Sequence, residues 1–130
     1  MARNTRTFSD IDLRFTPHPV TGDISLVYDE AAIKRSLKHL LLTSHYERHF
    51  HSEIGSPIRA LLFEPPGPMF AVTMRRTIIN TITNFEPRVN LIDVTIRESR
   101  DSNEVFVSIE FKIVNTESPL SIDLVLERTR

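Results

Sequence analysis

The spacing of hydrophobic residues along the chain changes at Pro87. Before this proline, apolar side chains recur every three to four positions, which is the spacing of one helix face: Phe70, Met74, Ile78, Ile82 and Phe85. After it, apolar and polar residues alternate, as they do in strands that bury one side. The chain is therefore predicted to form helices first and strands afterwards, which is an α+β domain.

Three alternating segments follow Pro87, at residues 91–99, 104–114 and 120–128. The polar stretch at 99–103 suits a hairpin turn between the first two. The side chains expected to face inward are Val105, Val107, Ile109, Phe111 and Ile113, then Leu120, Ile122, Leu124 and Leu126. We expect an antiparallel meander, with helices packed on one face of a small sheet formed mainly by the C-terminal third. Such a sheet has exposed edges, to which a strand of another chain can add.

Two further helices are predicted upstream. Asp29 is expected to be the N-cap of a helix over residues 30–43, and Ser56 the cap of a short helix that starts at Pro57. The prolines of 64–68 end the short helix, and the longest helix covers 69–84. The segment 44–58 between the first two helices is predicted to be mainly a loop.

The 130 residues are expected to form a single domain, 1–130, in which residues 1–22 are an extended N-terminal arm. Phe8, Ile11, Leu13 and Phe15 would anchor this arm on its own domain or on a neighbouring protein.

The composition excludes several classes of function. A net charge of -1 gives no general attraction to nucleic acid or to an anionic membrane, so neither is expected as a partner. No apolar stretch approaches the roughly 18 residues of a membrane span. The chain has no cysteine, which excludes disulfides and thiolate metal sites.

Four of the five histidines cluster at His39, His45, His49 and His51. The spacing of His45 and His49 is that of a zinc-protease helix, but the acid, Glu47, lies one position too late. The segment is also predicted to be a loop, so no metal site is expected.

Five carboxylates are candidates for acid–base hydrolysis: Glu47, Glu53, Glu64, Glu86 and Asp93. The chain has no Gly-x-Ser-x-Gly motif and no glycine-rich phosphate loop. No catalytic residue and no cofactor is therefore assigned, and the protein is not expected to be an enzyme. Arg75 and Arg76 are expected to lie on a solvated helix face.

The joint Glu86-Pro87-Arg88 places an acid and a base on either side of a proline. Pro87 biases Glu86 towards extended geometry, in which residues two apart point to the same side. Both charges could then bind groups on a partner. Alternatively, Arg88 could reach back to the carbonyls at the end of the preceding helix. The residues alone leave these two possibilities equal.

Several motifs resemble those of the sheath-initiator family, the small baseplate wedge proteins of contractile-tailed bacteriophages and contractile injection systems. They are the "FSDIDLRF" at 8–15, the "ERHFHSEIGS" at 47–56, the "LLFEP" at 61–65 and the "NFEPRVNLIDVTI" at 84–96. The Glu-Pro-Arg tripeptide after a helix is the hallmark of that family. The loop departs from the pattern at His45-Tyr46, where a glycine is common, and at Ser52, where a proline is common.

The resemblance implies a structural role in the tail baseplate of a virion, made in the host cytoplasm. The expected partners are the helical core bundle of the wedge scaffold proteins, contacted through Glu86, Pro87 and Arg88, and the tail sheath protein, whose first ring would add strands to the sheet. Several copies, expected to be six, would sit in each baseplate. Some family members have been called lysozymes, so a peptidoglycan hydrolase is the alternative that the resemblance leaves.

Overall fold

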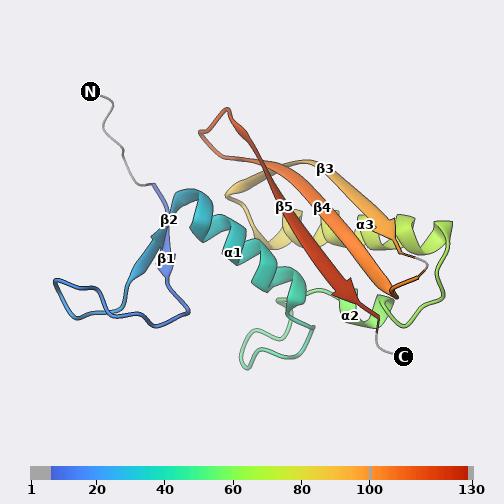
Figure 1. The fold of residues 1–130 in the computed structure, drawn as a ribbon, viewed down its shortest axis with the longest axis horizontal. Helices are drawn as coiled ribbons and strands as arrows, with labels where there is room; N and C mark the ends of the chain where they lie inside the picture. The colour runs from blue at the N-terminus through green and yellow to red at the C-terminus, as the bar shows by residue number, and fades with distance from the viewer. Residues whose placement is uncertain (1–6, 100, 129–130) are drawn as a thin grey trace. The chain divides into compact units, whose positions relative to one another are not determined.

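The computed structural model describes residues 7–99 and 101–128. Figure 1 shows the order of the elements along the chain. The contacts within the chain form two compact units, and the boundary between them falls inside helix α1 (Asp29–Leu42), after Ser36.

The first unit contains a small hairpin. Strand β1 (Ser9–Ile11) pairs antiparallel with strand β2 (Leu26–Tyr28). The loop between the strands is also extended in part, since Pro17 and Ile24 form an isolated antiparallel bridge. The predicted arm 1–22 is thus, from Thr7 onward, one side of a hairpin, and its first six residues lie outside the described part of the chain.

Asp29 does not cap α1 in the predicted way. Its backbone has a positive φ of 45°, and its Oδ1 accepts hydrogen bonds from the N–H groups of Thr7 (2.8 Å) and Phe8 (2.9 Å). The prediction failed because the two residues just before β1 supply backbone donors that compete with those of the helix start. Asp29 thereby fixes the beginning of β1 instead of the first turn of α1.

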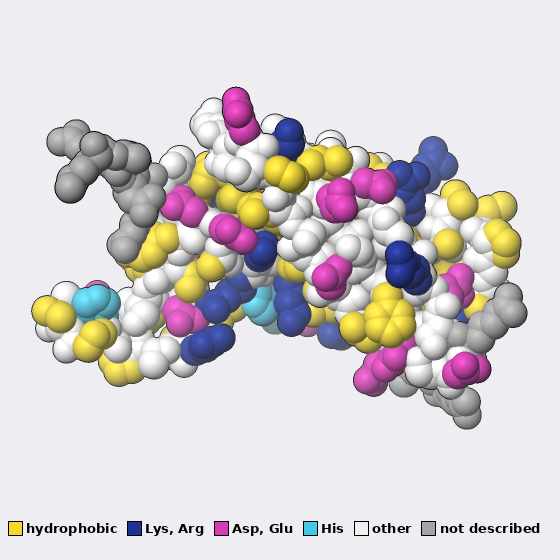
Figure 2. Space-filling model, turned by 45° about the horizontal axis from the view of Figure 1, so that its top comes forward, with side chains coloured by type: hydrophobic (Ala, Val, Ile, Leu, Met, Phe, Trp, Pro, Cys, Tyr) yellow, Lys and Arg dark blue, Asp and Glu magenta, His cyan; other side chains and the backbone are white. Residues whose placement is uncertain are grey.

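Asp12 fixes the other end of β1. Its carboxylate accepts a hydrogen bond from the backbone N–H of Arg14 and binds the Arg35 guanidinium. The Arg14 N–H, followed by Arg35, lowers the pKa of Asp12 below its usual value. Of the predicted anchors, Phe8 is half-buried, whereas Ile11, Leu13 and Phe15 are exposed. Figure 2 shows hydrophobic side chains on the hairpin, at the left of that view.

The second unit is built on a three-stranded antiparallel sheet. Its strands are β3 (Val89–Glu98), β4 (Glu104–Ile113) and β5 (Pro119–Glu127), in the order β3-β4-β5. This confirms the predicted α+β fold and the predicted meander, in which the chain reverses between Glu98 and Glu104. Strands β3 and β5 are the two edges.

One face of this sheet, called here the inner face, packs against helix α3 (Pro68–Phe85), as Figure 1 shows. The five inward residues predicted on β4 are all buried, and on β5 Leu124 and Leu126 are buried while Leu120 and Ile122 are half-buried. Phe70, Met74, Ile78 and Ile82 of α3 are also buried, and Phe85 only partly. Each such side chain contributes roughly 1.5–3 kcal/mol when fully buried, so this interface is the core of the unit.

The segment between α1 and the short helix α2 (Ile58–Leu61) is a loop, as predicted, without a helix or strand. Ser56 does not cap α2. Its Oγ donates to the carbonyl of Leu41 (2.6 Å), and its N–H donates to the carbonyl of Thr43 (2.8 Å). The end of α1 left these carbonyls without helical partners, and the returning loop satisfies them. The loop is thus tied to the helix from which it departs.

Gly55 permits this return, which leads to a stability prediction. Its φ is +146°, and an added Cβ would lie 2.8 Å from the carbonyl oxygen of Thr43. We expect Gly55→Ala to lower the free energy of unfolding by about 2–4 kcal/mol, because backbone strain and a backbone clash combine. Gly22→Ala is the control: φ is +69° but the space is open, so about 1 kcal/mol is expected. Denaturant unfolding of both variants measures the difference, and equal losses would contradict this account of Gly55.

Candidate functional site

The joint between α3 and β3 is formed by Glu86, Pro87 and Arg88. The N–H of Glu86 still donates to the carbonyl of Ile82 (2.9 Å), but its φ of -125° and ψ of 83° have left the helical region. Proline is the physical reason, since its ring disfavours helical geometry in the preceding residue. The chain enters β3 at Val89, and the N–H of Val114 at the end of the sheet donates to the carbonyl of Arg88 (2.9 Å).

Glu86 and Arg88 bind each other across Pro87. The Nε of Arg88 lies 2.7 Å from Oε1 of Glu86, and its Nη2 lies 3.0 Å from Oε2, so the ion pair is bidentate. The prediction that both side chains point to the same side is therefore confirmed. Glu86 is only 4% exposed, so its contribution to docking would consist in orienting Arg88, and the binding of a partner at this joint stays a prediction. The group that satisfies the buried carboxylate is the guanidinium two residues away.

Arg88 is the more accessible member of the pair, with 25% of its side chain exposed. Its orientation is held by two hydrogen bonds to a carboxylate that is itself buried. The pair thus presents a positioned guanidinium edge at the surface, beside an exposed Pro87. The sequence could suggest the pairing of these charges by their spacing, but not that one of them would be buried.

A groove of about 530 Å³ runs beside the joint. Helix α3 contributes Ile79, Ile82 and Thr83 to its walls, the joint contributes Glu86 and Pro87, and β3 contributes Val89, Asn90, Leu91 and Ile92. Ile92 is 49% exposed and lies where the β3–β4 register slips between Leu91 and Asp93. Such a bulge bends a strand and re-aims its side chains, so it explains why an isoleucine stands open to solvent here.

Arg75 is exposed, as predicted, but its side chain also binds strand β3. Its Nε donates to the backbone carbonyl of Val94 (3.0 Å) and its Nη2 binds Asp93 (2.8 Å). These contacts join the middle of α3 to β3 just after the bulge. Sequence analysis missed them because they depend on how α3 lies along β3, which brings together Arg75 and Asp93 although they are eighteen positions apart.

The other candidate residues do not assemble a catalytic or metal site. Glu47 accepts the N–H of Ser44 (2.8 Å), Glu53 lies near His51 (3.3 Å), and Asp93 binds Arg75. The groove that contains Glu86 has no second carboxylate in its lining. Within 7–99 and 101–128, no three histidine or acidic side chains gather as metal ligands, and no helix is long and apolar enough to cross a membrane.

The sequence matches the model of one protein family, the baseplate wedge protein gp25 family, over residues 27–118. The chain belongs to this family. It is 30% identical to the baseplate wedge protein gp25 of Enterobacteria phage T4 over 115 residues, which are 88% of this chain and 86% of the T4 protein.

Two solved structures have the fold of this gp25-family protein. A putative tail lysozyme from Geobacter sulfurreducens aligns with a TM-score of 0.72 at 19% identity, over 82% of this chain and 98% of that one. A chain of the postcontracted pyocin R2 baseplate aligns with a TM-score of 0.65 at 20% identity, over 82% and 98% of the two chains. At sequence identities of 19% and 20%, the similarity to these two structures shows a shared fold and no more.

The buried position of Glu86 predicts unequal effects of its removal and of the removal of Arg88. Arg88→Ala leaves a buried carboxylate without its guanidinium, so we expect a loss of about 2–4 kcal/mol in the free energy of unfolding. Glu86→Gln removes the charge but keeps an amide oxygen that can accept a hydrogen bond from Arg88, so about 1 kcal/mol is expected. Arg76→Ala, on the exposed face of α3, is the control and should change stability by less than about 0.5 kcal/mol. Chemical unfolding that finds Arg88→Ala as stable as the control would contradict the pairing.

The contact of Arg75 with Asp93 predicts a pH effect. The hydrogen bond from Arg75, followed by the one from the Val94 backbone, lowers the pKa of Asp93 below its ordinary value of 3.8. Because the folded pKa is the lower one, the contact stabilises the fold fully above about pH 4 and loses its effect as the pH falls through the folded pKa. In Arg75→Gln, NMR titration should show the pKa of Asp93 raised towards 3.8, and the difference in stability from the wild type should shrink below that pH. An unchanged pKa would contradict the contact.

Proposed function

We propose that this protein is a structural component of the baseplate wedge of a contractile tail. It docks on the helical core bundle of the wedge scaffold proteins through the joint Glu86-Pro87-Arg88, and its sheet gives the first ring of tail sheath an edge for strand addition. It acts in the virion, in several copies per baseplate, after synthesis in the host cytoplasm. Its membership of the gp25 family supports the baseplate role.

The observation that carries the docking proposal is the joint with its groove. A guanidinium held by two hydrogen bonds has lost its rotamer freedom before the partner arrives, so binding costs less entropy. The adjoining groove has both polar and apolar walls and includes the exposed Ile92, so it offers an apolar contact and the space for a helix side chain. Arginine is among the residues enriched in interface hot spots.

The sheet supports the second half of the proposal. It has three strands only, and both outer strands are nine or ten residues long. Long edge strands pair readily with other chains unless something covers them, and main-chain hydrogen bonds then supply the affinity. A sheath subunit that extends a strand could thereby continue the sheet.

A peptidoglycan hydrolase is the alternative, and one structural relative is called a putative tail lysozyme. Glycoside hydrolysis requires two carboxyl groups on either side of one bond. Glu86 is held by Arg88 and Asp93 by Arg75, and the groove at Glu86 contains no other carboxylate. The positions of these carboxylates therefore favour the structural role.

Two matched substitutions test the docking site. Ile92→Glu places a charge in the groove at the joint, whereas Val125→Glu places one on β5, at the other edge of the sheet. The exposed fractions of the two residues are similar, at 49% for Ile92 and 56% for Val125. We expect Ile92→Glu to weaken co-purification with the wedge scaffold proteins by tens of fold, because a charge would be desolvated on docking. Val125→Glu should co-purify like the wild type.

Circular dichroism of both variants controls for folding. Equal binding by both, or loss in Val125→Glu alone, would place the wedge contact elsewhere. Release of soluble fragments from purified cell wall by the wild-type protein, abolished in Glu86→Gln, would favour the hydrolase instead.

A further inference from the structure

The two edges of the sheet differ in which backbone groups they leave open. In an antiparallel pair, successive residues turn their N–H and C=O groups alternately to the partner strand and away from it. The N–H of Ser99 donates to the carbonyl of Glu104, and the N–H of Arg128 donates to the carbonyl of Asn103, which fixes the alternation in both pairs. The groups that point away from β4 are then those of Val94, Ile96 and Glu98 on β3. On β5 they belong to Ser121, Asp123, Val125 and Glu127.

The β3 edge is partly obstructed by α3 and by the segment just before it. The outward carbonyl of Val94 already accepts a hydrogen bond from Arg75 Nε (3.0 Å), and Arg75 also binds the neighbouring Asp93. At the C-terminal end of β3, the carboxylate of Glu98 accepts a hydrogen bond from the N–H of Gly67 (3.4 Å). Gly67 is the residue immediately before α3. The bulge at Ile92 interrupts the β3–β4 register towards the N-terminal end of β3. Bulges and covering side chains are the means by which edge strands are kept from pairing.

The β5 edge has none of these features. Its register with β4 runs without a slip from Pro119 to Glu127. Within the described residues, no backbone or side-chain hydrogen bond from another segment reaches the outward groups of Ser121, Asp123, Val125 or Glu127. Pro119 also stands at an outward position, where the absence of an N–H breaks no bond to β4. The backbone groups of every second residue from Ser121 to Glu127 are thus available to a partner strand.

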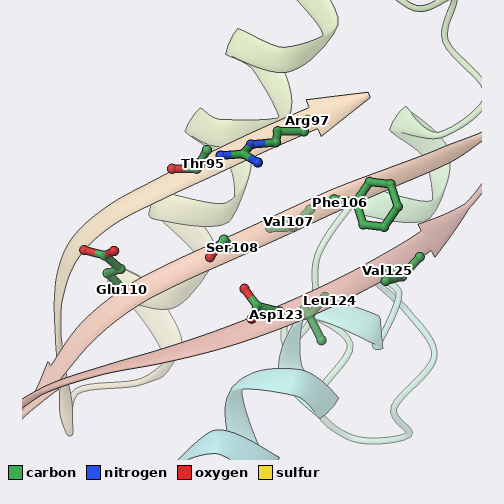
Figure 3. Close-up of a pocket in the computed structure, with 9 residues that line it drawn as sticks. All are labelled: Thr95, Arg97, Phe106, Val107, Ser108, Glu110, Asp123, Leu124 and Val125. Carbon is green, nitrogen blue, oxygen red and sulfur yellow. The ribbon is translucent and has the colours of Figure 1, made fainter. Parts of the chain in front are cut away.

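The side chains at these positions specify the chemistry of an added strand. Asp123, Val125 and Glu127 point to the outer face of the sheet, away from α3, and all are exposed. Figure 3 shows Asp123 and Val125 on β5, with Ser108 and Phe106 beside them on β4. Opposite charges stabilise a cross-strand pair and like charges destabilise it, so this edge selects cations opposite its two acids and an apolar residue between them. The other face of the added strand would continue the half-buried row of Leu120 and Ile122 and must be apolar.

We infer that β5, and not β3, is the edge that receives the partner strand, and that this strand carries basic, apolar and basic side chains at alternate positions opposite Asp123, Val125 and Glu127. The inference rests on the proposed function for the identity of the donor, an extended segment of a sheath subunit. The choice of edge and the chemistry of the strand follow from this chain alone.

Amide hydrogen exchange measured by NMR tests the choice of edge without the sheath protein. The probe is a ten-residue synthetic peptide with Lys, Val and Lys at three alternate positions and Val or Ile at the positions between them. At saturation, exchange should slow several-fold at the amides of Ser121, Asp123, Val125 and Glu127. The outward amides of Ile96 and Glu98 should not change. Slowing on β3, or on neither edge, would overturn the inference.

Charge reversal tests the chemistry of the strand. The double variant Asp123→Lys/Glu127→Lys should raise the Kd of this peptide on the order of ten-fold, since two favourable pairs become unfavourable. It should also bind a peptide with Glu in place of both lysines better than the wild type does. The control is Asp101→Lys/Glu117→Lys, the same change of charge at exposed turn residues. If the control weakens binding as much, the effect is one of net charge and the inference fails.

The sheath protein of the same tail separates this inference from the proposed function. Slowed exchange at β5 with the peptide, but no binding of sheath subunits, would leave the edge assignment intact and contradict sheath initiation. Sheath subunits that bind and slow the β3 amides would support sheath initiation and contradict the edge assignment. Protection of β5 by both probes supports both.

Discussion

The packing of α3 against the inner face of the sheet is the interaction on which the rest of the second unit depends. Four side chains of α3 are buried there together with the inward row of β4. Because strand side chains alternate between faces, this packing decides which residues of all three strands face solvent. It also places α3 alongside β3, so that Arg75 can reach the Val94 carbonyl and the groove forms beside Pro87.

An asymmetry between the two edges of the sheet follows from this arrangement. The helix that covers the inner face occupies one outward carbonyl of the β3 edge with a charged side chain. An arginine is suited to this, because one nitrogen can satisfy a backbone carbonyl while another binds a carboxylate. The separation of the two proposed binding sites is therefore a consequence of packing. The joint and its groove, proposed to bind the wedge scaffold, lie where α3 meets β3, and the edge proposed to bind the sheath strand lies on β5.

The joint shows how a surface contact can depend on a buried one. Without Arg88, Glu86 would lack the guanidinium that balances its buried charge, and without Glu86, Arg88 would lose the two hydrogen bonds that orient it. Together they make a bidentate pair of which the carboxylate is hidden and the guanidinium partly exposed. A pair of this kind adds little to stability compared with an apolar replacement, but it fixes the direction of the arginine. In the proposed docking, this fixed orientation would lower the entropic cost of binding.

The sequence by itself determined the elements. The change of period at Pro87, the alternation after it and the polar turn at 99–103 predicted α3 and the three strands, because hydrophobic spacing reflects which face of each element must be buried. Tertiary structure alone decided the partners of the polar groups. Asp29 binds the start of β1, Ser56 the end of α1, Arg75 the edge of β3, and Glu86 its neighbour Arg88. The physical reason is that a polar side chain binds whichever backbone or charged group the packed fold leaves unsatisfied nearby, and those groups are known only once the elements have come together.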